Sequence, residues 1–325
     1  MIPTTINKFK NMKRIVVQPF FLALVAFAIL IASCRNPMGV QPLNETPTRG
    51  NIKMSIDESF QLLFDTQAYT FQSLYEDAKI AITYKPEIDV VADLMNDSCR
   101  TVVLTRDLTK EEKDYLTSQK FVARTTKIAH DALALIVNRN NPDTLMLDTQ
   151  FADIFRGKLS TWKQINPKSP NNTINVVFDN NKSGNVRYFR EKFALTGNFP
   201  ENCFAVNNNL EVIKYVKENP NALGIISVNW ISDTQDSISE IFLKDVRVVE
   251  VGTNILNYCK PFQGYIADET YPFIRDVYVV SRETFSGLGT GFASFVAGDQ
   301  GQRIVLKSGL VPATMPIRLI QINKD

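Results

Sequence analysis

Histidine is almost absent from this chain, and cysteine is scarce: its 325 residues include one His and four Cys. The single His130 excludes a zinc site built on several histidines and weighs against a Ser-His-Asp hydrolase. No Cys-x-x-Cys pair or Cys/His cluster occurs, so the sequence predicts no metal and no cofactor. No nucleophile with an adjacent base stands out either. These absences weigh against an enzyme.

The chain has no marked excess of charge of one sign, with 36 basic and 34 acidic residues. Residues 1–33 contain four of the basic residues and no acidic one, so the remainder carries 32 basic and 34 acidic residues, a formal charge of −2. Proteins that bind DNA or RNA need a clustered basic face, which this balance does not supply. No G-x-x-x-x-G-K-[ST] segment exists, which excludes a P-loop. Nucleic acid is therefore a poor candidate partner.

Long apolar runs are also missing, apart from 13 residues at Phe20–Ala32. A spanning helix needs roughly 20 apolar residues, so this run, which follows Lys13-Arg14, is more typical of a secretion signal. The segment Ile31-Ala32-Ser33-Cys34 resembles the bacterial lipobox, in which the Cys is acylated and the chain is cut just before it. The resemblance implies a lipoprotein signal peptide over 1–33 and lipidation of Cys34. The alternative is an ordinary secretion signal with an incidental Cys.

The segment after Cys34 has almost nothing to bury. Arg35–Gly50 contains three prolines, two glycines and several small polar residues, and we expect residues 34–50 to form a flexible tether. The remaining ~275 residues are enough for a large core or for two lobes.

Three cysteines lie beyond the expected tether, at Cys99, Cys203 and Cys259. An odd number in an exported protein leaves at least one thiol free. We expect these residues to be small buried side chains, and one disulfide between two of them stays open as an alternative.

Strand-like and helix-like patterns alternate beyond residue 50. Ile52–Ile56 alternates as a strand, and Asp57-Glu58-Ser59 then supplies N-cap candidates for a helix through about Tyr75. The repeated order predicts an α/β protein with a parallel sheet covered by helices. Further strands are expected at 80–84, 101–104, 128–137, 174–178, 223–228, 246–251, 265–266 and 277–280. Further helices are expected at 88–95, from about 110, around 151–155, after 185 with Phe189 and Phe193 on one face, at 209–218 and from 291.

Two of the expected strand-to-helix connections could bind an anion. Asp57–Phe60 follows one strand, and Lys182–Asn185 follows another. Ligands of open α/β sheets gather at the carboxyl ends of strands, where a Ser hydroxyl and free amides at a helix start favour negative charge. Gly184 would let the backbone approach a ligand closely. Ser or Asn before a helix is more often only a cap, so neither segment alone establishes a site.

The order of segments resembles the phosphate-type (PstS-like) solute-binding proteins of bacterial ABC importers. The resemblance extends through nearly all of residues 50–316 and rests on seven loose motifs in the right order. They are IKMSIDESF at 52–60, IAHDALALIVN at 128–138, FADIFRGKLSTW at 151–162, Ser183-Gly184-Asn185 before Phe189, GIISV at 224–228, Tyr271-Pro272, and FASFVAGDQGQRIVLKSGLVP at 292–312.

The resemblance implies a two-lobed type II periplasmic-binding-protein fold with a ligand cleft between the lobes. Lobe one would comprise 51–130 plus 271–325, and lobe two 131–270. The family's ligand-binding positions correspond here to Ser59, Phe60, Thr105, Arg106, Ser183, Gly184 and Asn185.

In function, the resemblance implies a non-enzymatic, lipid-anchored protein on the periplasmic side of the cell envelope, expected to be a monomer. It would capture a small anion, with phosphate favoured, and present it to the permease subunits of an ABC importer. The alternative is a surface or periplasmic lipoprotein that keeps the scaffold but acts as a sensor or interaction module without transport.

Two departures from the family pattern affect the expected anion loop. The family usually has Ser-Gly-Thr where this chain has Ser183-Gly184-Asn185, and an Arg four residues before that Ser, where this chain has Asp179. An Arg there would supply a bidentate pair of donors, which a carboxylate cannot. Arg106 or Arg187 could compensate.

Acidic side chains near the expected cleft do not exclude phosphate. A carboxylate can accept the proton of monohydrogen phosphate and so reject sulfate. Asp57, Asp107 and Asp179 are the candidates for this role. His130 is expected to pack at the hinge, with a position facing the cleft as the alternative.

Overall fold

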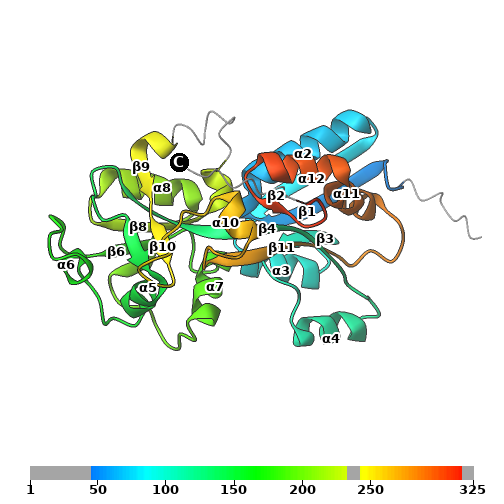
Figure 1. The fold of residues 1–325 in the computed structure, drawn as a ribbon. Coiled ribbons are helices and arrows are strands. Elements are labelled where there is room, and N and C mark those ends of the chain that lie inside the picture. Colours follow the sequence, from blue (N-terminus) through cyan, green and yellow to red (C-terminus); the bar gives the residue numbers. More distant parts are fainter. Residues whose placement is uncertain (1–44, 233–241, 317–325) are drawn as a thin grey trace, which may run out of the picture. The chain divides into compact units, whose positions relative to one another are not determined.

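The computed structural model describes residues 45–232 and 242–316 (Figure 1). Glu45–Asp325 form one compact unit. The expected signal peptide, Cys34 and residues 34–44 of the expected tether lie outside the described residues. The rest of the expected tether contacts the folded region, because Glu45 accepts a hydrogen bond from the backbone N–H of Leu288 (3.1 Å). Within 45–232 and 242–316, no helix is long and apolar enough to cross a membrane.

One group of strands, with its helices, is called lobe one here. In the order β2-β1-β3-β11-β4, the first three strands pair in parallel, and β11 runs antiparallel to both of its neighbours, β3 and β4. The expected parallel sheet is therefore a mixed one. The strands are β1 (Gly50–Asp57), β2 (Ala78–Lys85), β3 (Thr101–Leu104), β4 (Arg124–Asn138), β11 (Ile274–Ser281) and the short β12 (Val311–Pro312), which pairs with β4. The helices are η1 (Glu58–Phe60), α2 (Gln61–Leu74), α3 (Glu87–Met95), α4 (Lys110–Ser118), α11 (Leu288–Ala297) and α12 (Asp299–Lys307).

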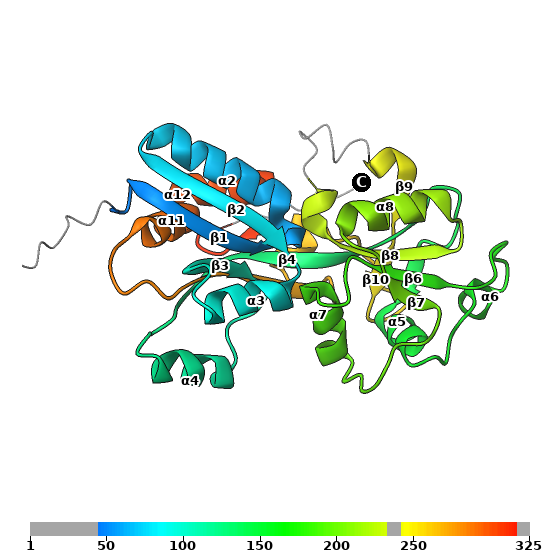
Figure 2. The same ribbon diagram turned by 180° about the vertical axis from the view of Figure 1, so that it is seen from behind.

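Lobe one buries apolar side chains on both faces of its strands. Helices α2, α11 and α12 cover one face and α3 the other, as Figures 1 and 2 show from opposite sides. On the first face Phe71 packs edge-on against Phe292, with ring centroids 5.3 Å apart. Parallel strands covered on both faces need apolar side chains at nearly every position, which explains the continuous run TVVL in β3.

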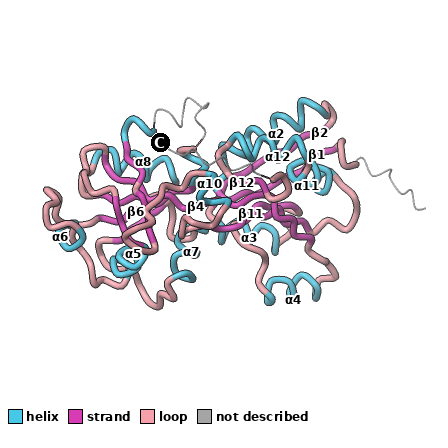
Figure 3. Tube along the Cα trace, in the orientation of Figure 1, coloured by secondary structure: helices cyan, strands magenta, loops and turns pink. Residues whose placement is uncertain are grey.

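The second group, called lobe two, continues from the far half of β4 through β8, β6 and β7 (Figure 3). Its strands are β5 (Leu145–Leu147), β6 (Asn175–Phe178), β7 (Cys203–Ala205), β8 (Ala222–Ser227), β9 (Val246–Val248) and β10 (Glu250–Gly252). Its helices are α5 (Asp148–Phe155), α6 (Trp162–Ile165), α7 (Gly184–Lys192), α8 (Asn209–Glu218), η2 (Val228–Trp230) and α10 (Gln263–Ala267).

Aromatic rings hold α5 and α7 of lobe two against the rest of its core. Phe151 contacts Phe189 and Phe273 edge-on or tilted, with centroids 5.0 and 5.5 Å apart. Phe189 and Phe193 lie on one face of the helix, as the sequence predicted, with stacked rings 5.7 Å apart. Each such pair contributes about 0.5–1.5 kcal/mol beyond the area it buries. This packing fixes α7, whose first residues matter below.

Two predicted strands differ from the structure. The expected strand at 265–266 is wrong, because this segment forms α10: the N–H of Ile266 bonds to the carbonyl of Phe262 (3.0 Å), a helical spacing. Two apolar residues carry too little pattern to distinguish strand from helix. The expected strand at 246–251 is two strands, since β9 pairs with β4 and β10 with β5. The break falls at Val249, whose N–H bonds to Leu135 instead (2.8 Å).

Strands β4 and β11 connect the two lobes. Residues 124–132 of β4 pair with β11, and residues 133–137 pair with β8. In the shared ladder, Arg275 lies opposite Asp131 and Asp276 opposite His130. Neighbouring residues of a strand point to opposite faces, so these two pairs lie on opposite sides of the hinge strands.

Candidate functional site

The two predicted anion loops meet in the structure. Asp57 ends β1, and its Oδ1 accepts the N–H of Ser59 (2.9 Å) at the start of η1. Gly184 begins α7 on the other side. A Cβ at Gly184 would lie 2.5 Å from Thr105 Oγ1 and 3.1 Å from Asp57 Oδ2, so only glycine allows the helix start to come this close. The first turn of α7 therefore faces the end of β1.

Ser183 is the N-cap of α7 and also holds an acidic neighbour. Its Oγ accepts the N–H of Val186 (3.3 Å) and donates to Asp179 Oδ1 (2.7 Å). Both Ser183 and Asp179 are buried. An N-cap of this kind typically stabilises a protein by about 1 kcal/mol. The hydroxyl is thus fully used within the protein.

Glu87, at the start of α3, connects the lobes. Its carboxylate accepts the N–H of Thr105 (2.8 Å) and Nε of Arg187 on α7 (2.5 Å), and also the Thr105 hydroxyl. Arg187 Nη2 in turn donates to Thr105 Oγ1 (2.8 Å). Burial alone would raise the pKa of Glu87, but the charge and hydrogen bond of Arg187 lower it. The ionised Glu87 thus joins lobe one to lobe two.

Two further contacts cross between the lobes at more exposed positions. Lys182 Nζ lies 3.0 Å from Asp89 Oδ1, and the side chain of Asn209 donates to Glu58. A cavity of about 260 Å³ opens beside these contacts. Both lobes line it, through Asp57, Glu58, Gln61, Tyr84, Lys85, Pro86, Asp179, Asn180, Asn207, Asn208 and Leu210.

Arg275 of β11 is the most unusual residue of this region. Its side chain is 2% exposed, and its Nε donates to Asp131 Oδ2 (2.8 Å). Its Nη1 and Nη2 have no hydrogen-bond partner among the described residues. The guanidinium lies 5.6 Å from the centroid of the Phe60 ring, a cation–π distance. A buried cation with two unused donor groups is costly unless something else binds them.

Other buried polar atoms beside Arg275 also lack partners within the described part of the chain. They are Asp57 Oδ2, Ser59 Oγ and both amide atoms of Asn185. Asp57 and Arg275 make no direct ion pair, although the charge of Arg275 offsets part of the rise in the pKa of Asp57 that burial causes. Donors and acceptors without a partner among the described residues thus come from both lobes, at or just after the end of β1, on β11 and at the start of α7.

Two more carboxyl groups line the same region with raised pKa values. Burial raises the pKa of Glu58 to about 8, with the charge of Asp179 adding to the effect. Burial likewise raises the pKa of Asp179 to about 7, with Asp57 adding to the effect against the hydrogen bond from Ser183. Near pH 7 these groups therefore bind protons to a large extent, which limits the negative charge of the site.

The structure brings six of the seven predicted ligand-binding residues together, around the ends of β1 and β3 and the start of α7. Arg106 bonds to Glu112, through Nη1 and Nη2 at 2.7 Å each, and reaches the group only through Glu87, which lies 3.8 Å from its Nε. Asp107 bonds to Lys113 (2.6 Å) and Thr125 (2.8 Å), away from this region.

Sequence reasoning missed Arg275 and Asp131. Their signal was a charged residue inside an apolar strand, in IRDVYVVS and in IAHDALALIV. A charge at such a position must be paired, and the register of the two strands supplies the pair. Only the antiparallel pairing of distant segments, which the sequence does not show, places them side by side on the hinge strands.

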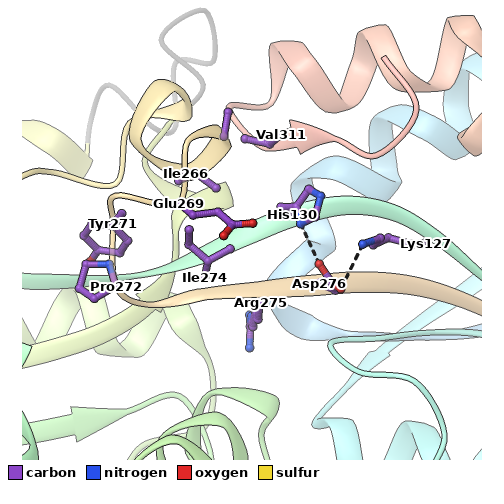
Figure 4. A pocket seen from close by; sticks show the side chains of 11 residues that line it. Lys127, His130, Ile266, Glu269, Tyr271, Pro272, Ile274, Arg275, Asp276 and Val311 are labelled. Carbon is purple, nitrogen blue, oxygen red and sulfur yellow. Dashed lines mark hydrogen bonds and ion pairs between the residues drawn. The ribbon is translucent and has the colours of Figure 1, made fainter. Parts of the chain in front are cut away.

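His130 lies on the other face of the hinge strands. Its Nδ1 is 2.7 Å from Asp276 Oδ1, and Lys127 Nζ is 3.4 Å from Asp276 Oδ2. These residues line an open cavity of about 560 Å³, and Figure 4 shows Arg275 pointing away from them. His130 therefore takes part in hinge packing, the arrangement that the sequence favoured.

The remaining side chains that could bind a metal are dispersed. Cys99 and Cys203 are half-buried, Cys259 is buried, and all three are free thiols. Across residues 45–232 and 242–316, no group of three or more His, Cys, Asp and Glu side chains is arranged to hold a metal ion.

Curated relatives cover part of the chain. A phosphate-binding protein PstS of Staphylococcus saprophyticus is 26% identical over 194 residues, which cover 59% of this chain and 57% of that protein. The PstS of Staphylococcus epidermidis is 26% identical over 204 residues, 61% of this chain and 59% of its own. The chain thus spans less than two thirds of the length of these relatives.

Solved structures match more of the chain and show the fold. A phosphate ABC transporter substrate-binding protein from Clostridium perfringens, solved with bound phosphate, has a TM-score of 0.70 at 23% identity, covering 81% of this chain and 100% of that one. An ABC-type phosphate transport receptor from Vibrio cholerae has a TM-score of 0.62 at 21% identity, covering 82% and 100%. The fold is the two-lobed type II periplasmic-binding-protein fold.

A family model described as a PBP superfamily domain matches residues 42–300, most of the chain. The match includes every strand described above except β12, together with both helix starts and the hinge residues. This protein therefore belongs to the PBP superfamily.

Proposed function

We propose that this protein captures phosphate in the enclosed region between its lobes and delivers it to an ABC importer. The observation that carries the proposal is the group of buried donors and acceptors, contributed by both lobes, that no described residue satisfies. A tetrahedral oxyanion needs donors from several directions, as these groups and the start of α7 provide. The phosphate-binding names of the relatives agree with this chemistry.

The predicted residues take different roles in this proposal. Ser59 and Asn185 donate to the ligand, Phe60 forms the apolar floor, and Gly184 lets the start of α7 reach it. Ser183 positions this helix start through its cap. Thr105 and Arg106 act through Glu87 instead, because Thr105 bonds to Glu87 and Arg106 Nε lies 3.8 Å from it.

Asp57 gives the site its selectivity. Its unused Oδ2 is an acceptor that faces the helix start at Gly184. A phosphate that carries a proton can donate to this oxygen, whereas sulfate, which has no proton near neutral pH, would meet a repelling carboxylate.

Binding is coupled to closure of the two lobes. We place the lobe boundaries where the chain crosses the hinge, near His130 and near Tyr271, so that lobe one comprises 51–130 plus 271–325. The bond between Glu87 of lobe one and Arg187 of lobe two requires the lobes to be together. Hydrogen bonds from one ligand to both lobes would stabilise the same closed state further.

The proposed location is the periplasmic side of the cell envelope, with lipid on Cys34 as the membrane anchor. Palmitate labelling of the full chain tests the anchor, with Cys34→Ser as the control. Incorporation that persists in the variant would contradict it.

Isothermal titration tests the ligand. The chain from Arg35 onward, stripped of ligand by unfolding and refolding, is titrated with phosphate and, separately, with sulfate. We expect micromolar or tighter binding of phosphate and no heat with sulfate. Absence of heat and of a thermal shift with both anions would contradict phosphate capture.

The alternative function is a sensor or interaction module on the same scaffold. The carboxyl group of Asp179, at the position where the family has an Arg, favours it. Phosphate binding without phosphate uptake in cells that carry the protein would support this reading over transport.

A further inference from the structure

A buried guanidinium with an unused pair of donors points to a binding role that the family pattern does not contain. Where the family has an Arg before the anion loop, this chain has Asp179, whose carboxyl group is buried and bonds to Ser183. The two other arginines near the loop are already paired, Arg187 with Glu87 and Arg106 with Glu112. A positive charge that neutralises a bound oxyanion must therefore come from another helix or strand.

We infer that Arg275, on the hinge strand β11, binds the ligand's anionic oxygens through Nη1 and Nη2, and that Asp131 positions it. This inference rests on the proposed function, since it names the residue that neutralises the proposed phosphate. The inference places the cation that binds the ligand on the hinge strand β11, whereas the family pattern has an Arg in the loop before α7.

The hydrogen bonds of Arg275 fix the direction of its free edge. Of the guanidinium nitrogens of Arg275, only Nε donates to Asp131 (2.8 Å), which also accepts the hydroxyl of Ser227 (2.8 Å). One edge of the guanidinium is thus anchored to lobe-two residues of the hinge. The outer pair, Nη1 and Nη2, keeps the fork geometry that matches two oxygens of one oxyanion.

The surroundings of Arg275 agree with a ligand at this edge. Phe60, at the start of α2, faces the guanidinium, so the cation also contacts lobe one. Asp57 is near enough for the two charges to influence each other, yet they form no ion pair. A group placed between them would receive hydrogen bonds from Arg275 and donate a proton to Asp57. A singly or doubly charged, protonated tetrahedral oxyanion has this combination of groups.

Another buried arginine, Arg282, has its outer nitrogen Nη1 bonded, and its Nε is the atom that has no hydrogen-bond partner among the described residues. Arg282 is 4% exposed and follows β11 directly. Its Nη1 donates to the carbonyl oxygens of Leu94 (2.7 Å) and Met95 (3.3 Å), and its guanidinium lies 3.8 Å from the Phe121 ring centroid. Arg282 lies outside the cleft, so it is a matched control.

The experiment compares phosphate affinity in Arg275→Gln, Arg275→Lys and Arg282→Gln, with the wild-type protein measured alongside by isothermal titration. We expect Arg275→Gln to weaken phosphate binding about 100-fold or more, because a bidentate, charge-assisted contact is lost. Arg275→Lys should recover only part of the affinity, since an ammonium cannot form the fork. Arg282→Gln should lower the melting temperature and leave the dissociation constant within about twofold.

Removing Arg275 leaves Asp131 buried without its partner, so Arg275→Gln is also made together with Asp131→Asn. Folding of each variant is checked by circular dichroism. Wild-type affinity for phosphate in the double variant or in Arg275→Lys would overturn the inference while leaving the proposed function intact. Failure of the wild-type protein itself to bind phosphate would instead contradict the proposed function.

Discussion

The two faces of the hinge strands carry paired acidic and basic side chains at adjacent positions of one ladder, yet their surroundings differ. Arg275 and Asp131 are 2% and 0% exposed, and Arg275 Nη1 and Nη2 have no hydrogen-bond partner among the described residues. His130 and Asp276 face the opposite cavity, are each 32% exposed, and receive further contacts from Lys127 and Tyr278. The same backbone geometry thus supports a costly, incomplete pair and a solvated, satisfied one.

This difference separates a functional arrangement from a structural one. A solvated ion pair typically contributes less than about 1 kcal/mol and needs no ligand to explain it. A buried pair is rarely favoured over apolar side chains for stability alone, and our proposal assigns the free donors of Arg275 to ligand binding. The cleft face is therefore where we place the ligand.

The largest expected loss of stability follows from replacing the acidic residue of the buried pair, Asp131, and the control replaces that of the solvated pair, Asp276. Asp131→Asn leaves the Arg275 cation buried without its counter-charge and should lower the free energy of unfolding by about 3–5 kcal/mol. Asp276→Asn, in the solvated pair, should cost less than about 1 kcal/mol. Urea unfolding without phosphate measures both. Equal losses would show that the two faces do not differ as described.

The next effect concerns the contact that joins the lobes. Arg187→Gln removes the cation that keeps Glu87 ionised and buried. The variant should destabilise the closed state, in which the Glu87 carboxylate would be buried without its counter-charge, more than the open state, in which water would hydrate it. We expect about tenfold weaker phosphate binding by isothermal titration. Arg190→Gln, on the same helix but bonded to the carbonyl of Gly197, is the control and should bind normally. Equal affinity in both variants would contradict a role of Glu87 in closure.

Carboxyl groups on the two sides of the hinge strands should change the stability of the fold with pH in opposite directions. The pKa of Asp179 is raised to about 7 and that of Glu58 to about 8. The contribution of these two groups to the free energy of unfolding is therefore complete at acid pH and is lost as pH rises through these values. The pKa of Asp276 is lowered to about 2, so its contribution is lost as pH falls toward 2. Asp179→Asn should flatten the alkaline side of the stability curve.

Urea unfolding of the ligand-free protein between pH 3 and pH 8 measures this effect, with Asp276→Asn as the reciprocal variant that flattens only the acid side. A steep loss of stability between pH 5 and pH 8 that persists in Asp179→Asn and in Glu58→Gln would contradict the assignment.

The smallest effect is expected at His130. His130→Gln removes one contact of Asp276, while Lys127 and Tyr278 remain beside it. We expect less than about 1 kcal/mol of lost stability and less than twofold change in phosphate affinity. A tenfold change in affinity would show that the outer face of the hinge takes part in binding.

Many strands and helices of this fold could be predicted from the local pattern of apolar and capping residues. The strand at 101–104 and the helix at 209–218 have the predicted bounds, because apolar periodicity and capping residues specify them. Asn208 illustrates the signal, since its side chain accepts the N–H of Glu211 (2.9 Å). The strand expected at 265–266 failed because two residues carry no period.

The proposed binding site was less accessible to sequence reasoning. The loops at Ser59 and Ser183 carry a recognisable local chemistry, and the structure brings them to one region. Arg275 has no such signature, because its position depends on the register of two strands about 140 residues apart in the chain. Long-range pairing of this kind is not written in any local segment.

The crystal structure of the wild-type protein with phosphate tests the central claim most directly. We predict one phosphate between the lobes, with oxygens within hydrogen-bond distance of Arg275 Nη1 and Nη2 and another oxygen against Asp57 Oδ2. A phosphate bound elsewhere, or ordered water alone on the free edge of Arg275 while phosphate occupies the cleft, would contradict the account.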